Sequence, residues 1–431
     1  MLNRGVEVII HAFKRHVWII VLLAFYLFVN VWFLVTHPGS IFNQPERFGE
    51  AISIYGSRDG SLYAKMAWQL IQKGVYGYNA DYPNAYVTPG QPFYLAAIYK
   101  AAEILNTNHV MLTRLANMIL NLGIVLLIYL ISIKLFKNKW VGLVAGLLYC
   151  MHIAPLHYFR TALTEIPSIF LFLLSIFVFL MALEKKKYRY HLAFGIVASI
   201  MLMFRATPAP ILIFAWGIVL YRFGFIEGVK IGFIWTIGPL LIMVPWVIRN
   251  MLQFGHLYLF SSHAGGPLLG GANPFYTIDQ GQLVAEAVEQ GLSAEEYGKK
   301  RILEGFRENF PLYFSWFTVG KTIWLFMDQH GNPDGLGPYT KDFSAGLKGF
   351  FKWQNPLVIL FSFIAIVLFR KHRPFMLMSV VVIIYIFFSN IFLTLPRYGL
   401  LIYPVLCILA SYGFFKAGRN IIALTNKSKR V

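Results

Sequence analysis

The chain has 431 residues, of which 58% are hydrophobic and only 13% are charged. A soluble domain carries about 25% charged residues, so this composition excludes an ordinary soluble protein. The net charge of +19 would suit a nucleic-acid-binding protein. However, the basic residues gather in short connections between apolar segments, where they set membrane orientation. We therefore expect a polytopic membrane protein that binds no nucleic acid.

Apolar segments long enough to cross a membrane recur along the whole chain. A helix needs about 20 residues to cross the roughly 30 Å hydrocarbon core of a bilayer. The ten candidate spans are 17–35, 115–133, 140–157, 164–183, 192–204, 208–221, 231–248, 355–369, 375–394 and 399–415. The segments 192–204 and 208–221 are short, so the count of about ten depends most on them. The expected fold is an all-α polytopic membrane protein.

The basic residues predict the orientation of these spans. They gather in alternate connections and near both termini, at Lys14-Arg15, Lys134–Lys139, Lys185–Arg189, Arg222–Lys230, Arg370–Arg373 and Lys427–Arg430. Membrane proteins keep such residues on the cytoplasmic side. We therefore expect a multi-pass protein of the cell (plasma) membrane with both termini in the cytoplasm.

This orientation leaves two large segments outside the cell, residues 36–112 and 249–354. The first would be the catalytic outer loop of an N-terminal transmembrane module, residues 1–248. The second would cover the site, and residues 355–431 would form the C-terminal transmembrane helices and a cytoplasmic tail. Nearly all candidate chemistry therefore lies on the extracytoplasmic face.

The first outer segment has the pattern of two helices. Residues 61–74 alternate apolar and polar positions as an amphipathic helix does, and Gly74 is a typical helix terminator. A second helix is expected over residues 92–105, after the break that Pro89 and Pro92 impose.

The second outer segment also has helical patterns. Residues 281–308 predict one polar helix rich in glutamate, and residues 311–327 an apolar helix with Lys321 near its middle. A lysine at the bilayer centre costs about 2.5–3.5 kcal/mol on insertion scales, so we expect 311–327 to lie along the outer surface. The glycine-rich stretch Gly265–Gly271 has no following helix signal. It is interpreted as a flexible loop over the site rather than a phosphate cradle.

Charged residues gather at the outer ends of the expected spans. They are Asp59, Arg160, Glu165, Arg205, Arg249 and Arg397. An arginine at a helix end can simply extend its side chain to the interface. That alternative suits each arginine alone, but it explains less well why four arginines and two carboxylates share one face. Arginine binds phosphate through two parallel hydrogen bonds, and a carboxylate accepts a proton from an attacking hydroxyl. The pattern favours group transfer from a lipid-linked phosphate.

The sequence thus gives three sets of candidate site residues. The candidate catalytic residues are Asp59 and Glu165. The residues expected to bind the donor phosphate are Arg205, Arg249, Lys321, Arg397 and Arg160. The residues expected to contact the sugar or the acceptor are Arg58, Tyr63, Tyr86 and Tyr94. For each tyrosine, a place in the aromatic belt of the interface is an equally good explanation.

Metal binding has only weak support in the sequence. The histidines considered are His152, His157, His263 and His330. Two of them are five residues apart, which does not place them on one face of a helix. The two cysteines, Cys150 and Cys407, fall inside expected spans and suit packing better than metal binding. The sequence names no certain cofactor and leaves a divalent metal open.

Six motifs in this order give the chain a family resemblance. They are RDGSLYAKMAWQLIQKG at 58–74, TPGQPFYLAAIY at 88–99, FRTALTEIPS at 159–168, FRATPAPIL at 204–212, PWVIRN at 245–250 with the glycine-rich stretch after it, and LPRYGLLIYP at 395–404. Together they resemble the GT-C superfamily of membrane glycosyltransferases, in its family-39/family-83-like branch. That branch is similar to protein O-mannosyltransferases and aminoarabinose transferases. The resemblance runs from about residue 10 to about residue 415.

The resemblance implies roles for several residues. It assigns the catalytic acid of the first outer loop to Asp59, a second acid to Glu165 and a donor-binding arginine to Arg205. It also implies polyprenyl- or dolichyl-phosphate sugars as donors and inversion at the anomeric carbon. One departure is that Asp59 is followed by Gly60, where related mannosyltransferases often carry Asp-Glu. A metal bridged by two adjacent acids is therefore not expected.

These observations favour a membrane glycosyltransferase. The expected partners are a polyprenyl-phosphate sugar donor, a lipid, glycan or protein acceptor, and membrane lipids. The alternative is a polytopic transporter or a flippase for lipid-linked sugars, which would need charged residues distributed toward both faces. A non-catalytic scaffold would not need the group of carboxylates and arginines on one face.

Overall fold

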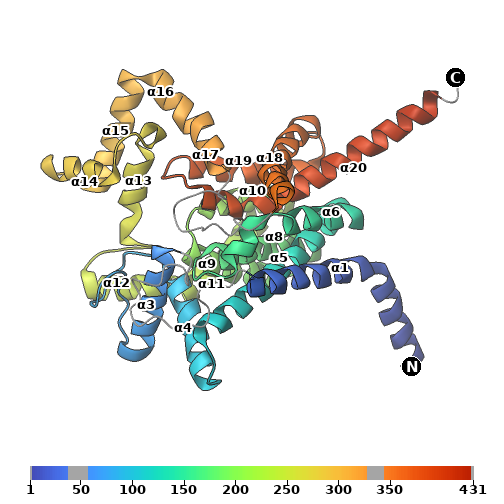
Figure 1. Cartoon of the computed structure of the whole chain (residues 1–431), viewed down its shortest axis with the longest axis horizontal. Coiled ribbons are helices and arrows are strands. Elements are labelled where there is room, and N and C mark those ends of the chain that lie inside the picture. Colours follow the sequence, from blue (N-terminus) through green and yellow to red (C-terminus); the bar gives the residue numbers. More distant parts are fainter. Residues whose placement is uncertain (1, 37–56, 328–343, 429–431) are drawn as a thin grey trace.

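The computed structural model describes residues 2–36, 57–327 and 344–428, and every regular element in these ranges is helical. The long helices form a bundle, and both ends of the chain project from the same end of it (Figure 1). Helices α3 (Arg58–Lys73) and α12–α16 lie at the opposite end. The bundle thus has one end that carries the termini and another that carries the segments with candidate chemistry.

The bundle is built from apolar helices. They are α1 (Leu2–Thr36), α5 (His109–Phe136), α6 (Lys139–Cys150), α8 (Glu165–Lys185), α9 (Tyr188–Phe204), α10 (Ala209–Phe223), α11 (Phe225–Ile242), α18 (Ala345–Leu368), α19 (Arg373–Ser389) and α20 (Tyr403–Ser428). Among the described residues, five helical stretches are long and apolar enough to cross a membrane, and four shorter apolar helices accompany them. The predicted all-α multi-pass fold is confirmed, while the count of ten spans stays a prediction.

Proline breaks two of the predicted spans. The segment 140–157 divides into α6 and the short α7 (Ile153–Tyr158), and the segment 231–248 divides between α11 and α12 (Val244–Phe254). A proline ring clashes with the carbonyl four residues earlier and has no N–H to donate. Pro155 and Pro245 therefore end the preceding helix, and each lies in the first turn of the next helix.

The first outer segment contains the two helices that the sequence predicts. Helix α3 begins at the Ser57 side chain, which accepts a hydrogen bond from Gly60 N, and ends at Gly74 in the left-handed conformation (φ 66°). Helix α4 (Gly90–Ile104) follows, and the two pack through small buried residues such as Ala64 and Ala67. Residues 37–56 of this segment lie outside the described residues.

The second outer segment differs from its prediction at two places. Residues 281–308 form two helices, α14 (Gln280–Glu289) and α15 (Ala294–Glu308), because Gly291 takes a positive φ of 65° and a capping box starts α15 at Ser293. The stretch 265–271 is a helix, α13 (Gly265–Gly271), and not a loop. Glycine occupies these helical positions because close neighbours leave no room for a side chain. A Cβ at Gly271 would lie 2.6 Å from the Phe392 backbone.

Residues 310–325 form one helical run with a π-turn in its middle. Helix α16 (Phe310–Ser315) leads into the π-turn Trp316–Gly320, and α17 (Lys321–Leu325) follows. A π-turn inserts one extra residue into the helical repeat. The buried positions therefore step by five from Trp316 to Lys321 and then by four to Leu325. This extra residue turns Lys321 into the interior, and the predicted place of 311–327 along the membrane surface stays a prediction.

Candidate active site

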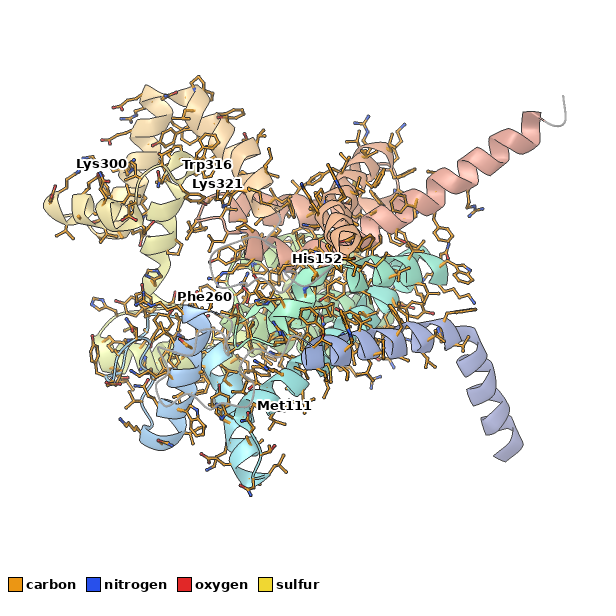
Figure 2. The ribbon with its side chains drawn as sticks, in the orientation of Figure 1. Met111, His152, Phe260, Lys300, Trp316 and Lys321 are labelled. Atoms are coloured by element: carbon orange, nitrogen blue, oxygen red, sulfur yellow. The ribbon has the colours of Figure 1, made fainter. Side chains whose placement is uncertain are left out.

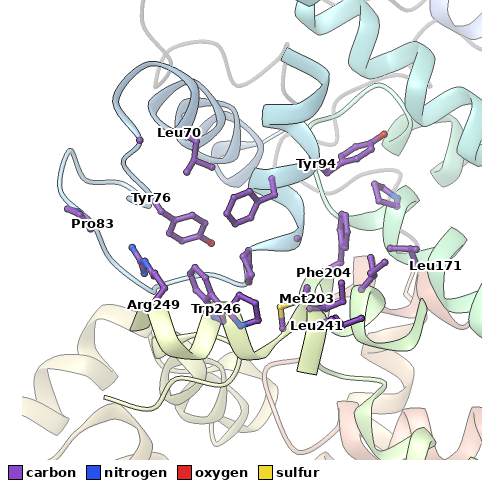
Figure 3. A pocket seen from close by; sticks show the side chains of 18 of the residues that line it. Leu70, Tyr76, Pro83, Tyr94, Leu171, Met203, Phe204, Leu241, Trp246 and Arg249 are labelled. Atoms are coloured by element: carbon purple, nitrogen blue, oxygen red, sulfur yellow. The ribbon is translucent and has the colours of Figure 1, made fainter. Parts of the chain in front are cut away.

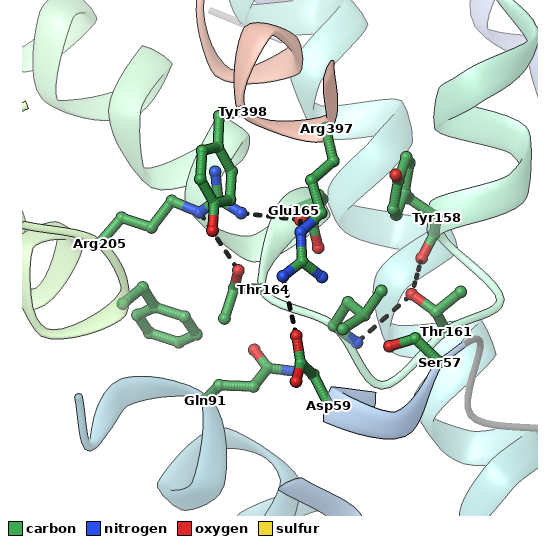
Figure 4. Close-up of polar contacts among 12 residues, drawn as sticks. Ser57, Asp59, Gln91, Tyr158, Thr161, Thr164, Glu165, Arg205, Arg397 and Tyr398 are labelled. Atoms are coloured by element: carbon green, nitrogen blue, oxygen red, sulfur yellow. Dashed lines mark hydrogen bonds and ion pairs between the residues drawn. The ribbon is translucent and has the colours of Figure 1, made fainter. Parts of the chain in front are cut away.

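Asp59 lies in the first turn of α3 with both carboxylate oxygens engaged. Its Oδ2 accepts a hydrogen bond from Arg397 Nη2 at 2.8 Å, and its Oδ1 accepts one from the Tyr78 hydroxyl at 2.9 Å. Arg397 arrives from η4 (Pro396–Leu401), 338 residues further along the chain (Figure 4). Two partners on opposite oxygens fix the plane of the carboxylate, while each oxygen keeps a lone pair for another donor.

The ionisation of Asp59 follows from these contacts. Burial by itself would raise the pKa of the carboxyl, but the charge of Arg397 and the hydrogen bonds from Arg397 and Tyr78 outweigh it. The pKa of Asp59 therefore lies below its ordinary value. The group is a carboxylate at neutral pH, which is the form that can accept a proton.

Glu165 and Arg205 form a second ion pair beside the first. Glu165 starts α8 and is only 2% exposed, and its Oε1 accepts a hydrogen bond from Arg205 Nη2 at 2.7 Å. Arg205 follows the last residue of α9 and also donates from Nε to Thr164 Oγ1. Arg397 Nε lies 4.0 Å from the same Glu165 oxygen. Asp59, Glu165, Arg205 and Arg397 thus form one connected set, here called the acid–arginine cluster (Figure 4).

Tyr398 holds the two guanidinium groups of the cluster near each other. Its ring centre lies 4.7 Å from Arg205 Cζ and 5.5 Å from Arg397 Cζ. An aromatic face attracts cations without neutralising them. Two arginines therefore lie close together with their charge retained, an arrangement suited to an anion.

Arg249 lies apart from the cluster, at a large apolar cavity. The cavity has a volume of about 920 Å³ and is lined by residues of α3, α4, α5, α8, α9, α11 and α12 together with the loop after α3 (Figure 3). Arg249 donates from Nη1 to the Asn84 carbonyl and to the Asn250 side chain, and its guanidinium lies 5.1 Å from the Trp246 ring. Burial lowers the pKa of Arg249. Within the part of the chain that the structure describes, it is the only charged residue that lines this cavity.

The cavity reaches the acid–arginine cluster through sequence neighbours. Among its lining residues, Pro167 follows Glu165 by two positions, and Phe204 immediately precedes Arg205. The cavity wall and the cluster are therefore built in part from the same short stretches of chain, at Glu165–Pro167 and Phe204-Arg205.

Lys321 and Arg160 make contacts with other parts of the structure. Lys321 is completely buried, and its Nζ donates to the carbonyls of Asn390 at 2.7 Å and Phe392 at 3.1 Å. It lies beside Trp316 in the α16–α17 arm (Figure 2). Arg160 places its guanidinium 4.9 Å from the Phe33 ring. Neither residue is among those that line the cavity, and their role in phosphate binding stays a prediction.

The residues predicted to contact sugar or acceptor fall into two groups. Arg58 is exposed at the start of α3, and the Tyr63 ring lies 5.9 Å from the Tyr78 ring next to Asp59. Burial raises the pKa of Tyr63, so its hydroxyl stays protonated.

Two further tyrosines lie outside the cluster. The Tyr86 hydroxyl lies 3.2 Å from His263 Nε2. Tyr94 lines the cavity and donates from its hydroxyl to Asn117 Oδ1.

Sequence reasoning missed three residues of the site. Tyr78 lies in a loop whose sequence carries no pattern that would assign it a role, and His263 was considered only as a possible metal ligand. Tyr398 had a usable signal, since it directly follows Arg397 in the motif LPRY.

A divalent metal bridging the two carboxylates does not fit this arrangement. The Arg397 guanidinium contacts Asp59 and lies 4.0 Å from Glu165, and the Arg205 guanidinium contacts Glu165. Two guanidinium groups therefore already compensate the two carboxylates. A dication there would meet like charges at contact distance. Among the described residues, no group of three histidine, cysteine or acidic side chains could hold a metal. His330 lies outside the described residues.

Comparisons with known proteins identify the fold. A family model described as dolichyl-phosphate-mannose-protein mannosyltransferase matches residues 89–249. The structure resembles that of the archaeal oligosaccharyltransferase AglB from Archaeoglobus fulgidus in complex with an inhibitory peptide and a dolichol-phosphate. The TM-score is 0.54 at 12% identity, over 97% of this chain and 52% of that one. It also resembles ArnT from Cupriavidus metallidurans bound to undecaprenyl phosphate, with TM-score 0.54, 13% identity, and 95% and 63% coverage. The chain has the GT-C fold.

The GT-C fold confirms the resemblance found in the sequence. The chain spans between about half and just under two thirds of the length of these two solved structures. No curated protein sequence matches it. Within the GT-C fold of this chain, the matched region 89–249 contains Glu165, Arg205 and Arg249, whereas Asp59 and Arg397 lie outside it.

Proposed function

We propose that this protein is a glycosyltransferase that moves a sugar from a polyprenyl-phosphate donor to an acceptor at the outer face of the membrane. The observation that carries this proposal is the acid–arginine cluster, whose Glu165 and Arg205 are sequence neighbours of residues that line a large apolar cavity. An apolar cavity suits an isoprenoid chain, and paired arginines suit its phosphate. A carboxylate held ionised beside them suits proton transfer.

The donor would bind with its lipid in the cavity and its phosphate at the arginines. The cavity lining offers one charge, Arg249, which can guide the phosphate past its aromatic neighbours toward the cluster. Arg205 and Arg397 then bind the phosphate near Asp59. Since an arginine stays charged when partly desolvated, it can compensate the charge that grows on the phosphate as the sugar leaves.

The reaction would be a single displacement. The acceptor oxygen or nitrogen attacks the anomeric carbon, and its proton passes to Asp59. The bond from that carbon to the phosphate oxygen breaks, and the polyprenyl phosphate leaves with the electron pair. Attack opposite the departing phosphate inverts the anomeric carbon. Glu165 does not touch the reacting atoms in this scheme and instead holds Arg205 in place through the 2.7 Å ion pair.

The side of the membrane follows from charge and from the arrangement of the helices. The basic connections indicate that both termini lie in the cytoplasm. The two ends of the chain project from one end of the bundle, and α3 and α12–α16 lie at the other (Figure 1). This arrangement supports an extracytoplasmic site covered by residues 249–354. The solved relatives include one bound to dolichol-phosphate and one to undecaprenyl phosphate, which supports a lipid-phosphate donor.

A transfer assay with purified protein tests the proposal. The protein in detergent is supplied with radiolabelled polyprenyl-phosphate sugars and with lipid, glycan and peptide acceptors, in the absence of any transmembrane gradient. A glycosyltransferase gives a labelled acceptor and free polyprenyl phosphate. A flippase or transporter gives neither, and that result would overturn the proposal. Lipid analysis of a deletion strain identifies the sugar, because the unused donor should accumulate.

A further inference from the structure

We propose that residues 262–325, here called the covering segment, position both hydrogen-bond partners of Asp59, with Tyr78 and Lys321 as positioning residues. The inference rests on the proposed function and concerns the same site. It is built on two chains of contacts that start in the covering segment and end at opposite oxygens of one carboxylate.

The first chain of contacts reaches Tyr78. The Tyr78 and Tyr86 rings stack at 5.2 Å with an angle of 8°, and Tyr86 stacks on His263 at 4.0 Å. His263 belongs to the covering segment, and Ser262 N next to it donates to the Ala85 carbonyl at 2.7 Å. The Tyr78 hydroxyl is therefore aimed at Asp59 by a stack that ends in the covering segment.

Gly266 makes room for this stack. A Cβ at Gly266 would lie 2.4 Å from the His263 ring, so a larger residue could not be placed here without moving the histidine. The imidazole is also neutral at pH 7, since burial lowers the pKa of His263. A neutral ring stacks on Tyr86 without placing a new charge near Asp59.

The second chain of contacts reaches Arg397. Residues 390–396 connect α19 to η4, and Lys321 Nζ donates to the carbonyls of Asn390 and Phe392 in this connection. Leu393 N donates to the Pro267 carbonyl at 2.6 Å. The covering segment thus holds this connection from two helices, α13 and α17.

Tyr276 holds the same connection closer to Arg397. Its hydroxyl donates to the Thr394 carbonyl at 2.7 Å and accepts from Thr394 N at 2.9 Å. A Cβ at Gly399 would lie 2.3 Å from the Leu325 carbonyl, so α17 also packs directly on η4. Arg397 is therefore delivered to Asp59 by backbone that the covering segment fixes on both sides.

The burial of Lys321 is the least expected feature of this arrangement. A fully buried ammonium without a carboxylate partner is disfavoured, and burial lowers the pKa of Lys321 to about 7. Two carbonyls and the Phe317 ring, 3.8 Å from Nζ, offset part of this penalty. A methionine would fill the space without the bonds, which makes Lys321→Met a selective test.

The test is the acid limb of the pH–turnover profile, which reports the ionisation of Asp59. The charged and titratable groups that face Asp59 are Arg58, Tyr63, Tyr78, Tyr86, Glu165, His263 and Arg397. Turnover needs the carboxylate and is lost as pH falls through its pKa. Removing a hydrogen bond to the carboxylate raises that pKa, so the acid limb moves to higher pH.

Tyr78→Phe keeps the stack and removes only the hydroxyl. We expect turnover to fall about 10-fold and the acid limb to rise by about half a unit to one unit. Lys321→Met should raise the acid limb in the same direction by a smaller amount, with the donor KM unchanged. Tyr276→Phe gives a second variant of the Arg397 side if Lys321→Met does not fold. The matched controls are Tyr82→Phe, at an exposed position of the loop that contains Tyr78, and Lys300→Met, at an exposed position of the covering segment (Figure 2). Both should keep the wild-type profile.

Two outcomes separate this inference from the proposed function. If Asp59→Asn is inactive while folded Tyr78→Phe and Tyr276→Phe keep the wild-type acid limb, the inference is wrong and the proposed function stands. A loss of activity without any movement of the limb also overturns it, because that would be a merely structural effect. If Asp59→Asn turns over normally, the assignment of the base itself fails.

Discussion

Arg397 gives the sharpest prediction, because it contacts one carboxylate and approaches the other. Arg397→Gln removes the 2.8 Å charge-assisted bond to Asp59 and the positive charge 4.0 Å from Glu165. A bond of this kind contributes about 1.5–3 kcal/mol. The Asp59 side chain is 38% exposed, so water screens the pair and the lower figure applies. About 1.5 kcal/mol corresponds to roughly one pKa unit.

Two effects on catalysis follow from this change. The pKa of Asp59 is lowered in the wild type, so losing Arg397 raises it and moves the acid limb up by about one pH unit. Losing one preorganised donor to the departing phosphate should also lower kcat about 10²–10³-fold. The donor KM should rise by a smaller factor than kcat falls, because Arg205, Arg249 and the apolar cavity still bind the donor.

The assay is single-turnover transfer between pH 4 and pH 9, with Arg249→Gln as the matched control. That control should raise the donor KM and leave the acid limb in place, since Arg249 lies in the cavity and not in the acid–arginine cluster. The reasoning is refuted if Arg397→Gln shows a higher donor KM with unchanged kcat and an unchanged acid limb.

Three further predictions concern stability, donor binding and topology. Glu165→Gln leaves the charge of Arg205 partly uncompensated and should lower the free energy of unfolding by about 3 kcal/mol, measured as a fall in Tm. An unchanged Tm would refute the stabilising role of the Glu165–Arg205 ion pair. Arg205→Lys keeps the charge and loses the fork that binds phosphate, so donor affinity should fall about 10-fold in a binding assay, and wild-type affinity would exclude Arg205 from the donor site. A cysteine at Lys186 should react only with reagents added to the cytoplasmic side and one at Gln290 only with reagents added outside; reversed labelling would overturn the assigned orientation.

The sequence predicted the members of the acid–arginine cluster because they are charged residues near the outer ends of the expected spans. Asp59, Glu165, Arg205 and Arg397 all fall on one face once the basic connections are placed inside. Their pairing was not predictable, since Arg397 pairs with an acid 338 residues away. Such a contact depends on how helices pack, which a single sequence does not encode in any local pattern.

Lys321 and Arg249 show two other limits of sequence reasoning. Lys321 was predicted to bind the donor phosphate from a helix along the outer surface, but the π-turn Trp316–Gly320 adds one residue and turns it into the interior. Arg249 was grouped with the other arginines by its place at a helix end. The break before α12 moves it to the cavity instead. One extra or missing residue in a helical repeat thus decides which face a charge takes.

The most direct test of the account compares the wild type with Asp59→Asn, measuring donor binding and single-turnover sugar transfer on the same preparations. Asparagine keeps the size of the side chain and can still accept a hydrogen bond, but it cannot take the proton of the acceptor. The account predicts donor affinity near that of the wild type and a turnover lower by about 10²–10⁴-fold. Normal turnover by Asp59→Asn would contradict it, and Glu165 would then be the next residue to test as the base.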